Sequence, residues 1–165
     1  MFEVLVYVYE NYWHGDACPE LARLERKLNA VGFESDEIRD ALNWLGDLNL
    51  ATQRESWRAE QIVSANTDAR VTLPSSHSMR VYSVAEQTHL GASCLGFITF
   101  LESSGVLPAT MREIVIDRAM VVPDGEVSLD ELKIIILMVH WSLGEEPNVL
   151  ILDELYDAKA KRIAH

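Results

Sequence analysis

The stretch that most constrains the fold is the apolar segment LDELKIIILMVHWSL at residues 129–143. Ser128 and Glu131 stand in the S-x-x-E pattern of a capping box, which predicts that a helix begins directly after Ser128. The segment is apolar on nearly all sides, and a helix of this kind lies in the centre of a protein rather than on its surface. The chain is therefore predicted to build other helices around this one.

Local signals predict three short helices in the first third of the chain. Residues 2–13 repeat apolar side chains at helical spacing, which predicts a buried amphipathic helix. Pro19 suits the first turn of a second helix, and Gly32 is placed to end it. Ser35 can cap a third helix that continues to about residue 49. Residues 1–50 are thus predicted to form a compact three-helix unit.

The last part of the chain, residues 83–165, carries a second set of helix signals. Ser83 and Glu86 form another capping box, and Gly91 predicts a break in the helix that follows. Pro108 can start the next helix, and a final helix is expected from about residue 147 to near the end. Together with the central helix, the prediction is an all-α fold of about seven helices in two packed helical halves.

Residues 51–82 differ from both halves because they are polar and contain few aliphatic side chains. They are predicted to form a long loop or weak hairpin, with short strands at 71–73 and 79–83. This segment would connect the two halves. A three-helix unit followed by a hairpin could also be a winged helix, in which residues 35–49 would be the recognition helix.

The net charge of −12, from 26 acidic and 14 basic residues, argues against binding of nucleic acid by this chain alone. The helix at 35–49 presents mostly carboxylates, whereas helices that read DNA present basic or amide side chains. A nucleic-acid module linked to DNA processing is the alternative function, and it would depend on the arginines Arg54, Arg58, Arg70 and Arg80. The favoured partner is another protein, with a basic surface, since complementary potentials speed encounter.

Size and residue usage predict a soluble cytoplasmic protein. A chain of 165 residues can bury a core without a disulfide or metal, and Cys18 and Cys94 form no C-x-x-C pair. No secretory leader is recognisable, and the longest apolar run, residues 134–139, is far shorter than a membrane helix. No membrane association is expected.

Three stretches suggest chemistry, and none satisfies its motif. VVPDGEVSLDEL, residues 121–132, resembles half of a calcium loop, but Met120 and Val122 would occupy positions that need oxygen ligands. His14, Asp16 and Cys18 lack the spacing of a zinc site. Residues 91–96 lack the G-x-S-x-G spacing of a nucleophile elbow. We therefore expect no enzyme activity, no cofactor and no metal.

Several long runs of the chain resemble the bacterial Smg family. They are MFEVLVYVYENY at the start, GFESDEIRDALNWL, SMRVYSVAEQTHLGASCLGFITFLESSGVL and VSLDELKIIILMV. The resemblance implies a small, largely helical cytoplasmic protein with no known catalytic residues to transfer. Genes of the family often lie beside those of a DNA-uptake processing protein and topoisomerase I, an association that shows no mechanism.

The candidate interaction surface consists of Trp57, Arg58, Arg80 and Tyr82 in and beside the polar segment. Aromatic residues and arginine are enriched in binding hot spots, and Trp57 has too few apolar neighbours in the sequence to form a core stripe. The competing interpretation is that Trp57 folds down to cover the helical core, as tryptophan commonly does.

Overall fold

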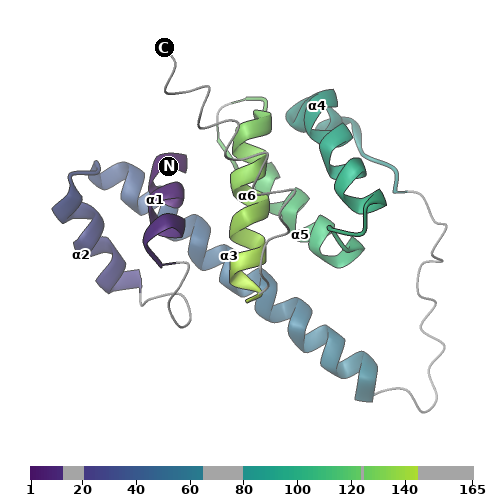
Figure 1. The fold of residues 1–165 in the computed structure, drawn as a ribbon, viewed down its shortest axis with the longest axis horizontal. Coiled ribbons are helices and arrows are strands. Elements are labelled where there is room, and N and C mark those ends of the chain that lie inside the picture. Colours follow the sequence, from purple (N-terminus) through teal and green to yellow (C-terminus); the bar gives the residue numbers. More distant parts are fainter. Residues whose placement is uncertain (13–20, 65–79, 124, 145–165) are drawn as a thin grey trace.

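The computed structural model describes residues 1–12, 21–64, 80–123 and 125–144, without the side chains of residues 55, 56 and 58–64. Over these ranges the chain is all-α and contains no strand (Figure 1), which confirms the predicted fold class. The helices are α1 (Phe2–Tyr12), α2 (Leu21–Val31), α3 (Ser35–Ser64), α4 (Val84–Ser103), α5 (Ala109–Met120) and α6 (Leu129–Ser142). The helix predicted from residue 147 lies outside the described residues.

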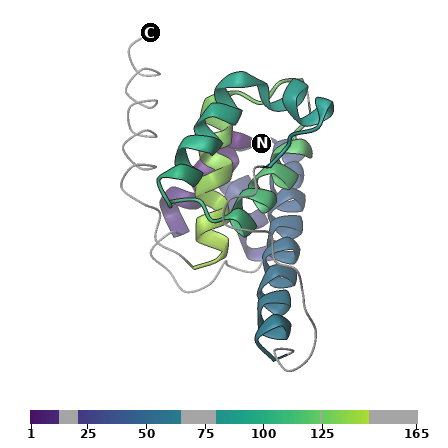
Figure 2. The same ribbon diagram turned by 90° about the vertical axis from the view of Figure 1, so that its right-hand side faces the viewer.

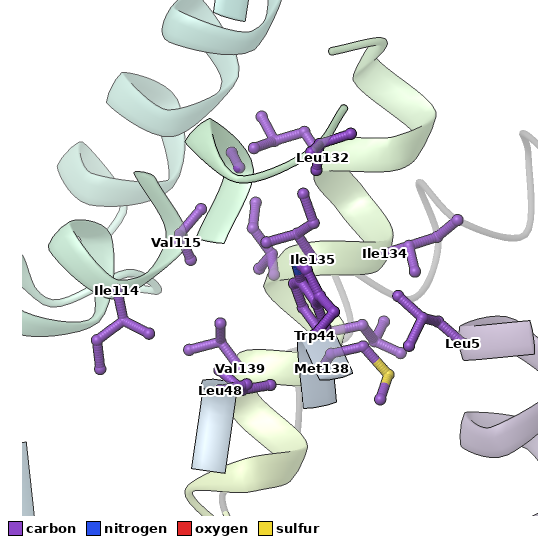
Figure 3. Packing of buried hydrophobic residues seen from close by; sticks show 14 of the residues in the cluster. Leu5, Trp44, Leu48, Ile114, Val115, Leu132, Ile134, Ile135, Met138 and Val139 are labelled. Atoms are coloured by element: carbon purple, nitrogen blue, oxygen red, sulfur yellow. The ribbon is translucent and has the colours of Figure 1, made fainter. Parts of the chain in front are cut away.

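The apolar helix α6 lies in the centre, as predicted. It packs against α1, α3, α4 and α5, and every residue from Leu132 to His140 is buried. Figure 3 shows Leu5 of α1, Trp44 of α3 and Val115 of α5 gathered around its side chains. Because α6 contacts helices from both ends of the chain, the two predicted halves share one hydrophobic core.

A lysine is accommodated within this buried stretch. The Lys133 side chain is almost fully covered, and its ammonium nitrogen lies 5.6 Å from the centre of the Phe97 ring in α4. A cation over an aromatic face is attracted by the ring quadrupole, which compensates part of the lost hydration. None of the described helices is both long and apolar enough to cross a membrane.

Both predicted capping boxes are confirmed. The Ser83 hydroxyl accepts a hydrogen bond from the backbone N–H of Glu86 at 3.2 Å, while the Ser83 N–H donates to the Glu86 carboxylate at 2.7 Å. Ser128 and Glu131 repeat the arrangement at 3.2 and 2.9 Å. The end of the stretch that resembles a calcium loop is thus the start of α6; Asp124 lies outside the described residues.

The predicted break at Gly91 is also confirmed. Gly91 has φ +65° and ψ 171° within α4, a conformation that an L side chain rarely adopts. The turn before α6 packs into this kink, where the Val127 N–H donates to the His89 carbonyl at 2.8 Å. A Cβ at position 91 would lie 1.9 Å from the Glu126 carboxylate, which would have to move aside, and the positive φ is the feature that favours glycine here.

The polar segment begins differently from the prediction. Residues 51–64 are not a loop or hairpin but continue α3, which runs for 30 residues to Ser64. Neither glycine nor proline interrupts the sequence there, and most of its residues are good helix formers. Thr52 is the last described buried residue of α3, and its hydroxyl lies 3.0 Å from that of Ser142 in α6.

Beyond Thr52 the helix extends past the body of the protein (Figures 1 and 2). A helix that projects into solvent can be polar on all sides, so the scarcity of aliphatic side chains, from which the sequence predicts a loop, is compatible with this helix. Residues 80–83 form no strand, contrary to the prediction for 79–83. The strand predicted at 71–73 lies outside the described residues.

Candidate functional site

Arg80, one of the four predicted surface residues, joins the chain before α4 to both α4 and α5. Its Nη2 and Nη1 atoms donate to the two carboxylate oxygens of Glu86 at 2.7 and 3.1 Å. Its Nε donates to Glu113 of α5 at 3.0 Å. The planar guanidinium therefore contacts two carboxylates at once, a geometry that lysine does not reproduce.

The hydrogen bonds between Arg80, Glu86 and Glu113 favour the charged form of each side chain. The side chains of Arg80 and Glu86 are only 20% and 17% exposed. Hydrogen bonding to Arg80 lowers the pKa of Glu86 to about 2, and the same bonds raise the pKa of Arg80 well above its usual range. Burial acts to raise the pKa of Glu113, but hydrogen bonds from Arg80 and Arg112 outweigh it and lower that pKa. All three groups are charged at neutral pH.

Arg112 of α5 extends the ion pairs, because its guanidinium contacts Glu102 of α4 and lies 2.8 Å from Glu113. We call the five residues Arg80, Glu86, Glu102, Arg112 and Glu113 the Arg80 cluster. Its charges are two positive and three negative, so the cluster is close to neutral on a strongly acidic chain.

Tyr82 supports the Arg80 cluster from one side. The Arg80 guanidinium carbon lies 4.7 Å from the centre of the Tyr82 ring, and partial burial raises the pKa of the Tyr82 hydroxyl. The large apolar side chains exposed here are Val81 and Val84, which are 85% and 80% exposed. Arg80 thus holds the chain before α4 against α4 and α5, while its neighbours in the sequence form the accessible surface.

Trp57 lies in the part of α3 that extends past the body, and its side chain is 59% exposed. In this structure it does not fold down over the core, contrary to the competing interpretation of the sequence. Leu50, two helical turns earlier, lies on the same side of α3 and is 53% exposed. The two apolar side chains are about 10 Å apart along the helix axis, from the rise of 1.5 Å per residue. The backbone of Arg58 belongs to α3, but its side chain lies outside the described part.

Trp57 lies on a different element from Arg80 and Tyr82, because Trp57 belongs to α3 and the other two precede α4. Figures 1 and 2 show the C-terminal end of α3 well away from the start of α4. We therefore treat Trp57 and the Arg80–Tyr82 pair as two candidate surfaces. That either one contacts a partner remains a prediction.

An acidic pocket was missed from the sequence. It opens between α1 and the α2–α3 corner and is lined by Glu3, Val31, Gly32, Phe33, Glu34 and Glu37. The amino-terminal ammonium of Met1 lies 3.4 Å from a Glu37 oxygen. Glu3 is distant in sequence from Glu34 and Glu37, and no linear pattern signals that the fold brings them together. The pocket favours a positively charged group.

Catalytic or metal chemistry gains no support from the described side chains. The Cys94 thiol is buried and donates to the Val127 carbonyl at 3.2 Å; burial raises its pKa to about 11, so it is protonated at neutral pH. Across residues 1–12, 21–64, 80–123 and 125–144, no three His, Cys, Asp or Glu residues are grouped to hold a metal. His14, Asp16 and Cys18 lie outside these ranges.

Fold and composition define this chain as an acidic, all-α protein. Comparison with known proteins gives its family. The family model described as "Protein of unknown function (DUF494)" matches residues 1–165. The "Protein Smg homolog" of Methylibium petroleiphilum is 56% identical to this chain, and that of Leptothrix cholodnii is 52% identical. The homologue of Bordetella avium is 47% identical.

Each of these alignments spans all 165 residues and the full length of the relative. The chain belongs to the Smg family, as its sequence runs predicted. No solved structure matches it. The family is described as one of unknown function, and the names of these relatives mention no ligand, substrate or partner.

Proposed function

We propose that this protein acts without catalysis, as a cytoplasmic interaction protein that binds another protein through the exposed face of α3 around Trp57. The observation that carries the proposal is the position of Trp57, a large aromatic side chain that is 59% exposed on a projecting helix. Tryptophan is among the residues most enriched in binding hot spots. Leu50 extends the same face, and two apolar anchors at i and i+7 suit a helix that docks into a groove.

A partner with a basic surface fits the charge of the chain. The net charge of −12 attracts cationic surfaces over a distance and repels acidic ones. The pocket lined by Glu3, Glu34 and Glu37 offers a place for a lysine or arginine side chain of the partner. The free, buried thiol of Cys94 is compatible with the reducing cytoplasm that the proposal assumes.

The decisive experiment captures partners from cell extract on the immobilised full-length protein, with Trp57→Ala compared with the wild type. We expect loss of a stoichiometric protein partner in the variant and an unchanged melting temperature. Leu50→Ala should weaken capture less strongly, because less apolar area is removed. Val121→Ala, which truncates an exposed apolar side chain outside α3, is the matched control and should leave capture unchanged.

Two outcomes would contradict the proposal. Equal capture of the same partner by wild type and Trp57→Ala would remove α3 as the binding face. Recovery of nucleic acid without a stoichiometric protein would favour the nucleic-acid alternative, whose binding would also fall steeply with added salt.

A further inference from the structure

The outer side of α4 is an exposed helix face that carries no charge. From Gln87 to Leu101 the sequence contains no Asp, Glu, Lys or Arg, in a chain where 24% of residues are charged. The inner side of the helix explains part of this, because Leu90, Cys94, Ile98 and Leu101 are buried. The outer side is different. Its exposed residues beyond the kink are Ala92, Ser93, Gly96, Thr99 and Phe100.

Within the described chain, this face has no cover. α4 packs on its inner side against α5 and α6, and Figure 2 shows it in front of them. The apolar segment of α6 is also nearly free of charge, but α6 is buried and needs no other explanation. Exposed helix faces of acidic proteins normally carry charged side chains. A face without them is suited to removal from water.

The carboxylates at the two ends of the face are each ion-paired with an arginine. Glu86 precedes the uncharged run and is ion-paired with Arg80. Glu102 follows the run and is ion-paired with Arg112. Both carboxylates that border the face are thus paired with arginines, although the Arg80 cluster as a whole keeps one negative charge. The outer side of α4 is consequently the place where a second acidic molecule meets little repulsion.

We propose that the outer side of α4 binds a second copy of this chain in a symmetric dimer. In such an interface the same patch meets itself, so any charge in its centre would face a like charge. An uncharged patch avoids this repulsion. A basic partner would gain less here than elsewhere on the chain, because the exposed residues of the face itself, Ala92, Ser93, Gly96, Thr99 and Phe100, carry no carboxylate. This inference does not rest on the proposed function, which concerns α3.

The shape of the face suits self-association. Phe100 is 51% exposed and stacks on Phe97 with ring centres 6.4 Å apart, so it forms a supported apolar protrusion. Gly96, one turn earlier, has no neighbouring atom within 4 Å of the position that a Cβ would take, and leaves a depression. When two copies of α4 cross near these residues, Phe100 of each copy packs over Gly96 of the other.

Sedimentation of the full-length protein over a wide concentration range tests the proposal. The wild type should pass from a mass of 18.6 kDa toward twice that value as concentration rises. Added salt should strengthen association, because it screens the repulsion between two chains of charge −12. Binding of a basic partner would respond to salt in the opposite direction.

Gly96→Glu is the sharpest variant, since the open space around Gly96 admits a side chain in the monomer. It places a carboxylate beneath Phe100 of the other copy, and we expect association to weaken at least about tenfold because an unpaired charge loses its hydration in the interface. Asn43→Glu adds the same charge on the exposed side of α3 and should leave the dissociation constant nearly unchanged. Phe100→Ala, which alters no charge, should also weaken the dimer. If circular dichroism shows that Gly96→Glu is unfolded, the dissociation constant of Phe100→Ala tests whether this face forms the interface.

A wild type that stays monomeric at every concentration would overturn the proposal. So would a dimer whose dissociation constant is the same in Phe100→Ala and Gly96→Glu as in the wild type, because the copies would then meet through another face.

Discussion

Arg80 and Glu86 form a two-pronged ion pair at the start of α4, with Nη2 2.7 Å from Oε1 and Nη1 3.1 Å from Oε2. The same carboxylate of Glu86 also accepts the N–H of the N-cap residue Ser83 at 2.7 Å. One glutamate therefore closes the capping box and holds the arginine that reaches α5. Loss of Glu86 removes both a helix cap and the ion pair with Arg80, whereas loss of Arg80 removes the link to α5 and leaves the capping box.

Arg80→Met should lower the free energy of unfolding by about 1–2 kcal/mol at neutral pH, because it removes charged hydrogen bonds that are partly shielded from water. Arg39→Met is the control and should change stability by less than about 0.5 kcal/mol. The Arg39 side chain is 65% exposed and contacts Asp36 on the same helix surface. Urea unfolding at pH 7 measures both, and equal effects of the two variants would contradict the ranking.

The contribution of this ion pair should depend on pH with a defined sign. The pKa of Glu86 is lowered from 4.5 to about 2 in the folded chain, so folding favours the charged carboxylate. Its stabilisation is complete above pH 4.5 and is lost as the pH falls toward 2. The stability difference between wild type and Arg80→Met should therefore shrink over this interval. A constant difference down to pH 3 would contradict the assignment.

Gly91→Ala and Gly96→Ala, two substitutions in the same helix, should have different effects on the free energy of unfolding. At Gly91 the φ of +65° opposes a Cβ and the Glu126 side chain would have to move, so we expect a loss of about 1–2 kcal/mol. At Gly96 nothing opposes it, and alanine should be neutral or stabilise by up to about 1 kcal/mol. Thermal unfolding separates the pair. The double variant Gly91→Ala with Glu126→Ala should recover only part of the loss, since the backbone angle remains.

Trp44→Ala and Trp57→Ala compare two tryptophans on one helix. Trp44 is 3% exposed and donates from its indole Nε1 to the Arg118 carbonyl at 3.2 Å. Its truncation should cost about 3–5 kcal/mol, whereas truncation of the exposed Trp57 should stay within about 0.5 kcal/mol. Chemical denaturation of both variants is the measurement. A large loss in Trp57→Ala would mean that the residue supports the fold and would weaken its assignment to a binding face.

Ser128→Ala should destabilise the protein by about 1 kcal/mol, because it removes the capping hydroxyl of the central helix. Calcium should leave the melting temperature of the wild type unchanged, since an ion that binds only the folded state would raise it. A calcium-dependent rise would show that the stretch at 121–132 does more than start α6.

The sequence predicts some of the candidate surfaces better than others. The chemical types at Trp57 and Arg80 were sufficient to select them, and the exposure of Trp57 agrees with a surface role. Their grouping was not predictable, because the continuation of α3 carries Trp57 away from the start of α4. The acidic pocket and the compensation of Glu86 and Glu102 depend on contacts between helices, for which a linear pattern gives no signal.

The sequence by itself determined where most of the helices begin and end. Capping at Ser83 and Ser128 joins groups three residues apart, and the turns at Gly32 and Gly91 depend on the freedom of one backbone angle, so these signals act within a single helical turn. The apolar sides of α6 likewise required a central position before any neighbour was known. Tertiary structure alone decided how far α3 projects, which partners occupy Arg80 and which side of α4 stays open. Those outcomes depend on pairs of groups that are distant along the chain, and only the packing of the helices around α6 determines which of them meet.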